Sequence, residues 1–423
     1  MKPISAAVLP DTAVLSTDNS FVGGVSLRSL AETYGTPLFV YDEATLRARC
    51  REAVALFDDG VAFASKSFLC GAMARLAADE GLCIDVATGG ELDLVLRSGV
   101  AARRIILHGN NKSRDEIARA LEVGVHRIVV DNNDDIDAIA DLLAPGATAH
   151  CLIRVTPGVE AHTHDFVRTG HEDTKFGFTV ATGAARAGIE RLKALPGVVL
   201  HGVHAHIGSQ IFGPEGFLEA IDILADFIAN DDFDELCIGG GLGVAYVEGE
   251  EALSITAWGQ MVRAAVAAKG LSHLRLLAEP GRSIVAQAGM TLYRVGAVKP
   301  VTQRTYMAVD GGMSDNPRPV LYGSGYEAFD IGRPLAERTQ TVRLVGKHCE
   351  SGDVLIDEAW LPAGTKRDDI IATPVTGAYG YAMASNYNRV PRPAVVFVAD
   401  GQARIVLRRE TFDDLAALEI DNG

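Results

Sequence analysis

Lys66 is the first residue whose type and position could support chemistry. It directly follows Val61–Ser65, an apolar run typical of a buried strand. An amine at the end of such a strand is partly removed from water, which favours the neutral, nucleophilic form that can bond to a carbonyl compound. A surface lysine that opens a loop is the simpler interpretation, and the position alone favours it.

A histidine-rich motif ends a later apolar run. In the segment His204–Gln210, the ring of His206 could stack on a flat aromatic ligand, while Gly208 and Ser209 offer N–H and hydroxyl donors to a phosphate. Histidines at this spacing also occur in metal sites, but no nearby carboxylate in the sequence completes one, so we expect no metal. His204 itself is interpreted as a core residue.

Two further motifs follow apolar runs. Consecutive glycines at Gly240 and Gly241 would let the backbone approach an anion closely. The carboxylate of Glu279 could hold a proton on a heterocyclic nitrogen, or it could simply pair with nearby Arg282. Each signal is weak by itself, and a structural ion pair explains the second about as well as a function does.

A thiol next to a carboxylate marks another candidate site. Cys349 and Glu350 lie in Gly346–Asp353, a polar turn that contains glycine. Most buried cysteines are inert packing residues, but the neighbours of this one are polar, which favours a functional thiol. Two similar polar, glycine-rich turns are Asp310–Arg318 and Gly377–Tyr381.

Short apolar, β-branched runs recur between residues 61 and 280. The first five begin 22, 22, 22 and 24 residues apart, which leaves room for one loop and one helix between strands. A capping box at Ser113–Glu116 and a plausible C-cap at Gly124 mark one of these helices. The expected strands are Val61–Ala64, Cys83–Val86, Ile105–His108, Arg127–Asp131, Cys151–Val155, Leu200–His206, Glu235–Gly239 and Leu274–Glu279.

Eight β/α units predict an α/β fold with a closed parallel (β/α)8 TIM-like barrel, and an open doubly wound sheet is the alternative. In such a barrel the carboxyl ends of the strands form the rim where ligands bind. A barrel built for stability alone would have little reason to gather charged and polar residues there. The residues expected at this rim are Lys66, Asp85, His108, Asp131, Arg154, His206, Gly240 and Glu279.

The pattern changes after about residue 285. Short strand-like runs separated by Gly/Pro turns replace the alternation with helices, which predicts a second, mostly antiparallel β domain. Strand-like pieces near the N-terminus are expected to join it. We therefore expect a barrel over residues 36–284, and a β domain made of residues 1–35 and 285–423.

Composition and charge limit the classes of function. The 423 residues carry a formal charge of −16, whereas a nucleic-acid-binding protein needs a basic surface. The six cysteines are too sparse for a disulfide scaffold, and none forms a C-x-x-C motif. No apolar run is long enough to span a membrane, and the N-terminus lacks the apolar core of a signal peptide. We expect a cytoplasmic protein that binds neither nucleic acid nor membrane.

Taken together, these motifs resemble those of the pyridoxal-phosphate-dependent decarboxylases whose fold is an alanine-racemase-like barrel plus a β domain. The likeness runs in order over nearly the whole chain, from about Phe39 to Leu418. The most specific segments are His206–Gln210, Glu279–Arg282, Cys349–Asp353 and Gly377–Asn388. The resemblance implies an enzyme that uses pyridoxal 5′-phosphate (PLP).

The resemblance also implies roles in cofactor binding. Lys66 would hold PLP covalently, His206 would stack on the pyridine ring, and Glu279 would pair with the ring nitrogen. Ser209, Gly240, Gly241 and Tyr379 would bind the phosphate, with Asp85 and Glu91 as support. The full predicted cofactor-binding set is Lys66, Asp85, His206, Ser209, Gly240, Gly241, Glu279, Gly281, Arg282 and Tyr379.

Substrate binding is implied for Arg282, Arg318, Tyr322, Glu350 and Tyr379. Lys66, His206 and Cys349 form the implied catalytic set. Cys349 would return a proton to the carbon that loses CO₂. In the family this thiol and Glu350 reach in from the partner subunit, so the resemblance implies a homodimer with active sites at the subunit interface. The lysine motif, Phe63–Phe68, departs from the Tyr-Ala-x-Lys-Ala-Asn that is commoner in the family, which changes the packing expected under the ring.

The implied reaction is the decarboxylation of meso-2,6-diaminopimelate to L-lysine and CO₂, the last step of lysine biosynthesis. Two arginines could clamp the distal carboxylate of this substrate, and Glu350 could accept its distal ammonium. The alternatives are a decarboxylase for ornithine, arginine or carboxynorspermidine, and a racemase of the same fold, which would use arginine rather than Glu279 at the ring nitrogen. A non-catalytic cofactor carrier would lack the β domain with Cys349.

Overall fold

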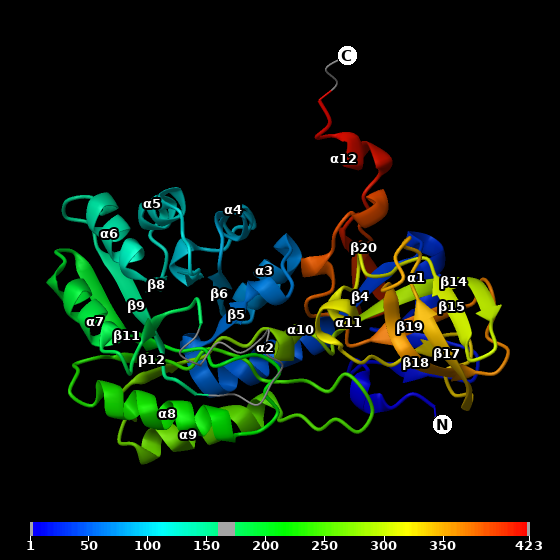
Figure 1. Ribbon diagram of the computed structural model, residues 1–423, viewed down its shortest axis with the longest axis horizontal. Coiled ribbons are helices and arrows are strands. Elements are labelled where there is room, and N and C mark those ends of the chain that lie inside the picture. The colour runs from blue at the N-terminus through cyan, green and yellow to red at the C-terminus, as the bar shows by residue number, and fades with distance from the viewer. Residues whose placement is uncertain (1–2, 160–173, 421–423) are drawn as a thin grey trace. The chain divides into compact units, whose positions relative to one another are not determined.

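The structure, a computed structural model, describes residues 3–159 and 174–420. The chain forms two compact units (Figure 1). One unit comprises residues 49–244 and 252–283, and the other comprises residues 1–48, 245–251 and 284–423. We describe each unit by itself.

The first unit is built on eight parallel strands. Their order in the sheet is β13-β12-β11-β9-β8-β7-β6-β5, and a parallel bridge between Val61 and Ala278 joins the two ends. The amide of Ala62 donates to the carbonyl of Ala278 at 2.9 Å, which closes the barrel. The strands are β5 (Ala62–Ala64), β6 (Cys83–Val86), β7 (Ile105–Leu107), β8 (Arg127–Val130), β9 (Ala149–Thr156), β11 (Val198–His204), β12 (Glu235–Cys237) and β13 (Arg275–Leu277), and the short β10 (Phe178–Thr179) pairs with β9.

Helices follow most of these strands (Figure 1). They are α3 (Gly71–Asp79), α4 (Gly89–Arg97), α5 (Arg114–Val123), α6 (Asn133–Leu142), α7 (Ala184–Ala194), α8 (Glu215–Ile228) and α9 (Ile255–Ala268), while α2 (Glu43–Phe57) precedes β5. The capping box expected at Ser113 and Glu116 is present, and Gly124 ends α5 in the left-handed conformation. The predicted barrel is thus confirmed, and the open sheet is excluded.

The barrel interior is a packed apolar core. One buried cluster takes a residue from nearly every strand, so the side chains form a layer across the barrel. Its members are Ala62, Cys83, Ile106, Val129, Leu152, Cys237 and Leu277. Because this layer fills the interior, polar side chains can gather only at the strand ends.

The second unit contains a mostly antiparallel sheet with the order β18-β17-β15-β14-β4-β20-β21, in which β19 pairs with β14 and β16 pairs with β19. Only the pairs β15/β17 and β20/β4 are parallel. The strands are β4 (Leu38–Asp42), β14 (Gly289–Pro300), β15 (Thr305–Val309), β16 (Phe329–Asp330), β17 (Arg338–Val345), β18 (Val354–Pro362), β19 (Ile370–Pro374), β20 (Ala394–Ala399) and β21 (Gln402–Leu407).

Smaller elements complete this unit. The N-terminal strands β1 (Val14–Leu15), β2 (Ser20–Val22) and β3 (Val25–Ser26) form a separate three-stranded sheet and are followed by α1 (Leu27–Tyr34). The remaining helices are α10 (Arg282–Val285), at the junction of the units, α11 (Arg318–Tyr322) and α12 (Phe412–Ala416). Within the described residues, no helix has the length and apolar character needed to cross a membrane.

The structure moves one expected domain boundary. Residues 36–48 were expected in the barrel, but β4 pairs with β14 and β20, so this segment belongs to the second unit. All five residues of β4 are buried, as in a barrel strand, and local composition cannot tell which sheet a buried strand joins. Residues 245–251, also expected in the barrel, belong to the second unit too, where Tyr246 packs edge-on against Tyr326.

Candidate active site

The rim of the barrel carries most of the residues that the sequence analysis predicted to bind the cofactor, and Tyr379 lies in the second unit. Lys66 lies in a short 3₁₀ turn, Ser65–Ser67, directly after β5. Its side chain is exposed in this chain, contrary to the partial desolvation expected from the sequence. Burial raises the pKa of Asp85 and lowers that of His206, and the Lys66 charge opposes the first shift and adds to the second. The amine of Lys66 therefore lies near both groups.

A glycine cradle lies where the ends of β11, β12 and β13 meet. A Cβ atom on Gly240 would lie 2.2 Å from the carbonyl oxygen of Glu279, and one on Gly241 would lie 2.3 Å from that of Gly208. Gly241 also has a φ of +104°, which side-chain-bearing residues rarely adopt. Only glycine fits at these two positions, and the cradle therefore brings backbone close to whatever binds there.

His206 is fixed as a neutral ring beside this cradle. The amide of Gly240 donates to its Nδ1 atom at 3.2 Å, so Nδ1 carries the lone pair. Burial lowers the pKa of His206 well below its usual value, and the charges of Lys66 and Arg154 act in the same direction. A neutral, oriented imidazole suits a flat face on which an aromatic ligand stacks.

Ser209, expected near the phosphate, and Arg282, expected to bind cofactor and substrate, meet in the structure. Nη2 of Arg282 donates to Oγ of Ser209 at 2.9 Å. Gly281 precedes this arginine, and a Cβ atom there would lie 2.9 Å from Cβ of Ala64. The loop after β13 therefore packs tightly on the strand that leads to Lys66, which brings several sequence-predicted residues together.

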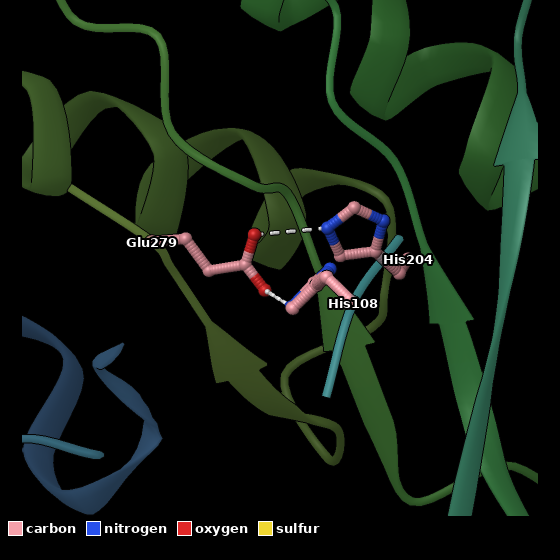
Figure 2. A group of neighbouring side chains, drawn as sticks. All are labelled: His108, His204 and Glu279. Atoms are coloured by element: carbon pink, nitrogen blue, oxygen red, sulfur yellow. Dashed lines mark hydrogen bonds and ion pairs between the residues drawn. The ribbon is translucent and has the colours of Figure 1, made fainter. Parts of the chain in front are cut away.

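Glu279 lies in a group that the sequence did not predict (Figure 2). Its Oε2 atom lies 2.9 Å from Nε2 of His204, and its Oε1 atom lies 3.0 Å from Nε2 of His108. The sequence treated His204 as a core residue and assigned His108 no role. A signal was available, because residues 204 and 206 point to the same face of a strand, and His108 had been placed at the rim.

This group corrects one step of the sequence argument. We expected no carboxylate near the pair His204 and His206, but Glu279 lies about 3 Å from His204, and His108 joins the group at a similar distance from Glu279. The three residues each offer one ligand atom, and these atoms lie within 4.8 Å of one another. The sequence could not reveal the group because its members come from strands far apart in the chain.

Buried charge is concentrated around Glu279. Burial raises the pKa of Asp85 to about 6, although His108 opposes the shift. Burial also acts to raise the pKa of Glu279, but the neighbouring His108 and His204 outweigh it and hold that pKa well below its usual value. The carboxyl of Glu279 is thus firmly ionised, whereas the carboxyl of Asp85 has a pKa close to neutral pH.

Two nearby residues have supporting contacts. The carboxylate of Glu91, expected as support, accepts the amide of Ala87 at 2.6 Å and so fixes the loop after β6. Arg154 had been placed at the rim without a role. Its Nη1 atom lies 3.6 Å from Asp131, and its guanidinium lies 4.3 Å from the centre of the Phe176 ring. It supplies a buried positive charge to the rim.

The second unit holds a buried arginine that pairs with no carboxylate among the described residues. Arg318 is 4% exposed, its Nη1 atom donates to the hydroxyl of Tyr326 at 2.8 Å, and its guanidinium lies 4.1 Å from the centre of the Tyr246 ring. Within residues 3–159 and 174–420, its side-chain partners are tyrosines rather than carboxylates, and its Nε atom is buried without a hydrogen-bond partner. An arginine in this state is suited to bind an anionic ligand.

The expected proton donor and its neighbour lie in the loop between β17 and β18. Cys349 is the one exposed cysteine among the six, and Glu350 is also exposed. The other five cysteines are buried, and burial raises the pKa of one of them, Cys151, to about 12. Tyr322 ends α11, and Tyr379 adopts a positive φ of 58°.

A buried aspartate holds the loop that carries Cys349. Asp353 accepts the amide of His348 at 2.8 Å and that of Met313 at 2.7 Å. Nε2 of His348 lies 2.8 Å from Oγ of Ser314. These bonds join the cysteine loop to the turn that begins at Asp310, which the sequence had flagged separately. Asp353 was not predicted as a functional residue.

Comparison with known proteins decides the family. A family model described as "Pyridoxal-dependent decarboxylase, pyridoxal binding domain" matches residues 43–286. The chain is 45% identical over 422 residues to the diaminopimelate decarboxylase of Mycobacterium tuberculosis, with 94% of each chain covered. It is 46% identical over 418 residues to that of Bacillus subtilis, again with 94% of each covered.

The chain belongs to the diaminopimelate decarboxylase family of pyridoxal-dependent decarboxylases. A solved structure supports this at the level of the fold. The diaminopimelate decarboxylase of M. jannaschii, in complex with L-lysine, superposes with a TM-score of 0.91 at 29% identity, with 97% of this chain and 98% of that chain covered. The resemblance that the sequence motifs indicated is confirmed.

PLP is therefore the expected cofactor, and the residues present fit it. The group needs a covalent anchor, an anion at its ring nitrogen, a flat contact for its ring and donors for its phosphate. Lys66, Glu279, His206 and the glycine cradle with Ser209 offer these four features in one unit. Neutral His206 and ionised Glu279 carry the protonation states that this chemistry requires.

Proposed function

We propose that the protein catalyses the PLP-dependent decarboxylation of meso-2,6-diaminopimelate to L-lysine and CO₂. The observation that carries the choice of substrate is Arg318, a buried guanidinium with no carboxylate partner in the described part of the chain. A substrate with an amino-acid group at each end brings a distal carboxylate that would pair with it. Ornithine has no such group, and a buried unpaired arginine would then be a pure cost.

Cofactor binding is proposed for the barrel residues named above. Lys66 supplies the amine that holds the cofactor, His206 supports its ring, and Ser209 with the glycine cradle binds its phosphate, to which Tyr379 adds a hydroxyl. Bound PLP supplies an electron sink for the carbon that loses CO₂. Ionised Glu279 holds a proton at the ring nitrogen and so keeps the ring electron-poor, and Asp85 adds a second carboxyl nearby.

Cys349 is proposed as the acid that returns a proton to the carbon from which CO₂ departs. An exposed thiol can reach a ligand, whereas the five other cysteines are buried. Arg282 and Arg318 bind the distal carboxylate of the substrate, Glu350 accepts its distal ammonium, and Tyr322 lines the same region. The distal carboxylate and the distal ammonium of the substrate thus each bind a group of opposite charge, which fixes the orientation of the substrate.

The assembly proposed is a homodimer with active sites at the subunit interface. Cys349 and Glu350 are exposed in a single chain, although a proton donor and a charge-selective contact work best where water is excluded. A second copy of the chain would cover them. We also propose a cytoplasmic location, which the six free thiols support, since such thiols persist in a reducing compartment.

The decisive experiment is to incubate the purified protein with PLP and meso-diaminopimelate and to measure CO₂ and lysine. Chiral analysis of the product distinguishes L-lysine from its mirror image. Ornithine, arginine and carboxynorspermidine, at matched concentrations, test the alternative decarboxylations, and racemised diaminopimelate without CO₂ would indicate a racemase. Faster turnover of any of these substrates than of meso-diaminopimelate would contradict the proposal.

A further inference from the structure

The carboxylate of Glu279 has a histidine at each of its oxygen atoms: His204 forms a hydrogen bond with it, and His108 forms an ion pair (Figure 2). Nε2 of His204 lies 2.9 Å from Oε2, and Nε2 of His108 lies 3.0 Å from Oε1. The three side chains are at most 9% exposed. The thiol of Cys237 also donates to Oε1 at 3.5 Å. A carboxylate with partners at both oxygens keeps a single orientation.

His204 is a neutral donor in this arrangement. Burial lowers its pKa to about 4, so the ring carries a single N–H near neutral pH. Because the facing carboxylate is ionised and can only accept, that hydrogen must be on Nε2. The structure agrees with this tautomer, since Nδ1 is buried and has no hydrogen-bond partner among the described residues. His204 therefore orients Glu279 without adding charge.

His108 differs from His204 in its charge. Burial acts to lower the pKa of His108, but the carboxylates of Asp85 and Glu279 outweigh it and raise that pKa above its usual value. Its Nε2 atom lies 3.7 Å from Oδ1 of Asp85 as well as 3.0 Å from Glu279. Arg154 opposes this charge from β9. His108 thus contributes positive charge as well as a contact.

The three residues come from strands that are not neighbours in the barrel. His108 follows β7, His204 is the last residue of β11, and Glu279 follows β13. No two of these strands pair with each other. Their side chains meet because each points from its own strand toward the inside of a closed barrel, at the layer just above the apolar core. The arrangement is specific to the rim where the cofactor residues lie.

We propose that His108 and His204 are positioning residues that fix the Glu279 carboxylate as an oriented anion for the ring nitrogen of PLP. The inference rests on the proposed function. His204 sets the direction of the carboxylate, and His108 stabilises its charge. Neither histidine is assigned a contact with substrate. An anion that is oriented before the cofactor binds needs no reorganisation when charge develops on the ring, which is where such groups are most effective.

The test compares two cofactors that differ at one atom. Dissociation constants of the apoprotein are measured for PLP and for its 1-deaza analogue, in which C–H replaces the ring nitrogen. The variant Glu279→Gln serves as the reference, because it shows how strongly the protein prefers PLP over the analogue when the Glu279 anion is absent. We expect the preference for PLP to fall about tenfold in His204→Leu, which loses one hydrogen bond to a charged group, and about tenfold in His108→Leu, which loses the ion pair with Glu279.

Conservative variants separate the two roles. His204→Gln keeps a donor near Nε2 and should stay within about twofold of the wild-type preference, because it replaces one neutral donor by another. His108→Gln keeps a donor but loses the charge, so its preference should fall. His150→Gln is the matched control. His150 lies near the N-terminal end of β9, away from the rim at the carboxyl ends of the strands, so this variant should leave the preference unchanged. If the leucine variants fail to fold, the two glutamine variants decide the question.

Four outcomes overturn the proposal, and they are distinguishable. An unchanged preference in the folded leucine variants, or equal effects of the two glutamine variants, removes the clamp while the proposed decarboxylation stands. A wild-type protein that binds PLP no better than the analogue does the same. A wild-type protein that fails to bind PLP overturns both the clamp and the function on which it rests.

Discussion

The two units differ in how their charged residues are surrounded. At the barrel rim, the charged groups are buried and lie next to groups of opposite charge or to hydrogen-bond partners. The carboxylate of Glu279 is ionised and contacts two histidines, while the pKa of Asp85 is raised to about 6. In the second unit, Cys349 and Glu350 are exposed, and buried Arg318 has no carboxylate partner in the described residues. The rim residues proposed to bind the cofactor, here called the cofactor half, already contact one another in the single chain. We propose that the residues of the second unit assigned to the substrate, here called the substrate half, gain their partners only when substrate and a second subunit bind.

This difference suggests how a protein recognises a cofactor that stays bound and a substrate that exchanges. A cofactor that stays bound can be held by a buried cluster of charged residues. The free-energy cost of removing these charges from water is then offset during folding rather than in every catalytic cycle. A substrate that enters and leaves needs an accessible acid and charged contacts on loops, which a buried aspartate, Asp353, holds in place by two backbone amides. The predictions below test this division, from the largest expected effect to the smallest.

Removing the covalent anchor should have the largest effect. Lys66→Ala should lower kcat by on the order of 10⁴, the upper end for a single group that handles protons and bonds. It should also remove the visible absorbance of the bound cofactor after extensive dialysis. Lys269→Ala, which breaks a surface ion pair with Asp222 on the same unit, is the control and should change neither. Retained colour in Lys66→Ala would remove this residue as the anchor.

Removing the proposed acid should leave the cofactor half intact. Cys349→Ala should lower kcat by about 10²–10³, a typical contribution of one general acid, while PLP affinity stays unchanged. Steady-state kinetics and a cofactor titration measure the two quantities. Lys347→Ala, an exposed change in the same loop, serves as the control. If Cys349→Ala instead weakened PLP binding, the division between the two halves would fail.

The arginine in the second unit should act on substrate binding. Arg318→Lys should raise KM for meso-diaminopimelate by about 10–100-fold, because a bidentate, charge-assisted contact of about 1.5–3 kcal/mol is lost. The effect on a substrate analogue that lacks the distal carboxylate should be small. Arg304→Gln, at an exposed pair with Asp357, controls for a general loss of positive charge. Equal effects on both substrates would argue against a carboxylate clamp.

The buried carboxyl of Asp85 should cost stability above its pKa. Burial raises the pKa of Asp85 from its usual value of 3.8 to about 6, so the carboxyl of the unfolded chain loses its proton at lower pH than that of the folded chain. The free energy of unfolding therefore falls as the pH rises from about 4 to 6. Asp85→Asn removes this loss. The variant apoprotein should be more stable than wild type by about 2–3 kcal/mol at pH 8 and equally stable at pH 4.

Denaturant unfolding at several pH values measures this difference. His108, Glu279, Lys66 and Glu91 are the groups whose charges act on Asp85, and all four stay in place in the variant. Asp93→Asn, an exposed carboxyl paired with Arg97 on α4, should show no such pH dependence. A difference that is the same at pH 4 and pH 8 would mean that packing, rather than ionisation of Asp85, is responsible.

Local patterns predicted much of the barrel correctly. The 22-residue spacing, the capping box at Ser113 and the glycine C-cap at Gly124 depend on residues close in the chain, and the structure has all of them. The strand Leu38–Asp42 was placed in the wrong unit, since a fully buried strand carries the same apolar pattern in either sheet. The roles of individual site residues remain predictions until the variants are measured.

By itself, the sequence determined the order of the β/α units, the family, and the residues that end each strand, because each of these is written in short stretches of chain. Only the tertiary structure decided that His108 and His204 meet the carboxylate of Glu279, and that Arg318 is buried beside two tyrosines. These contacts join residues far apart in the chain. They exist because closing a barrel or pairing a sheet fixes distances that no local pattern contains.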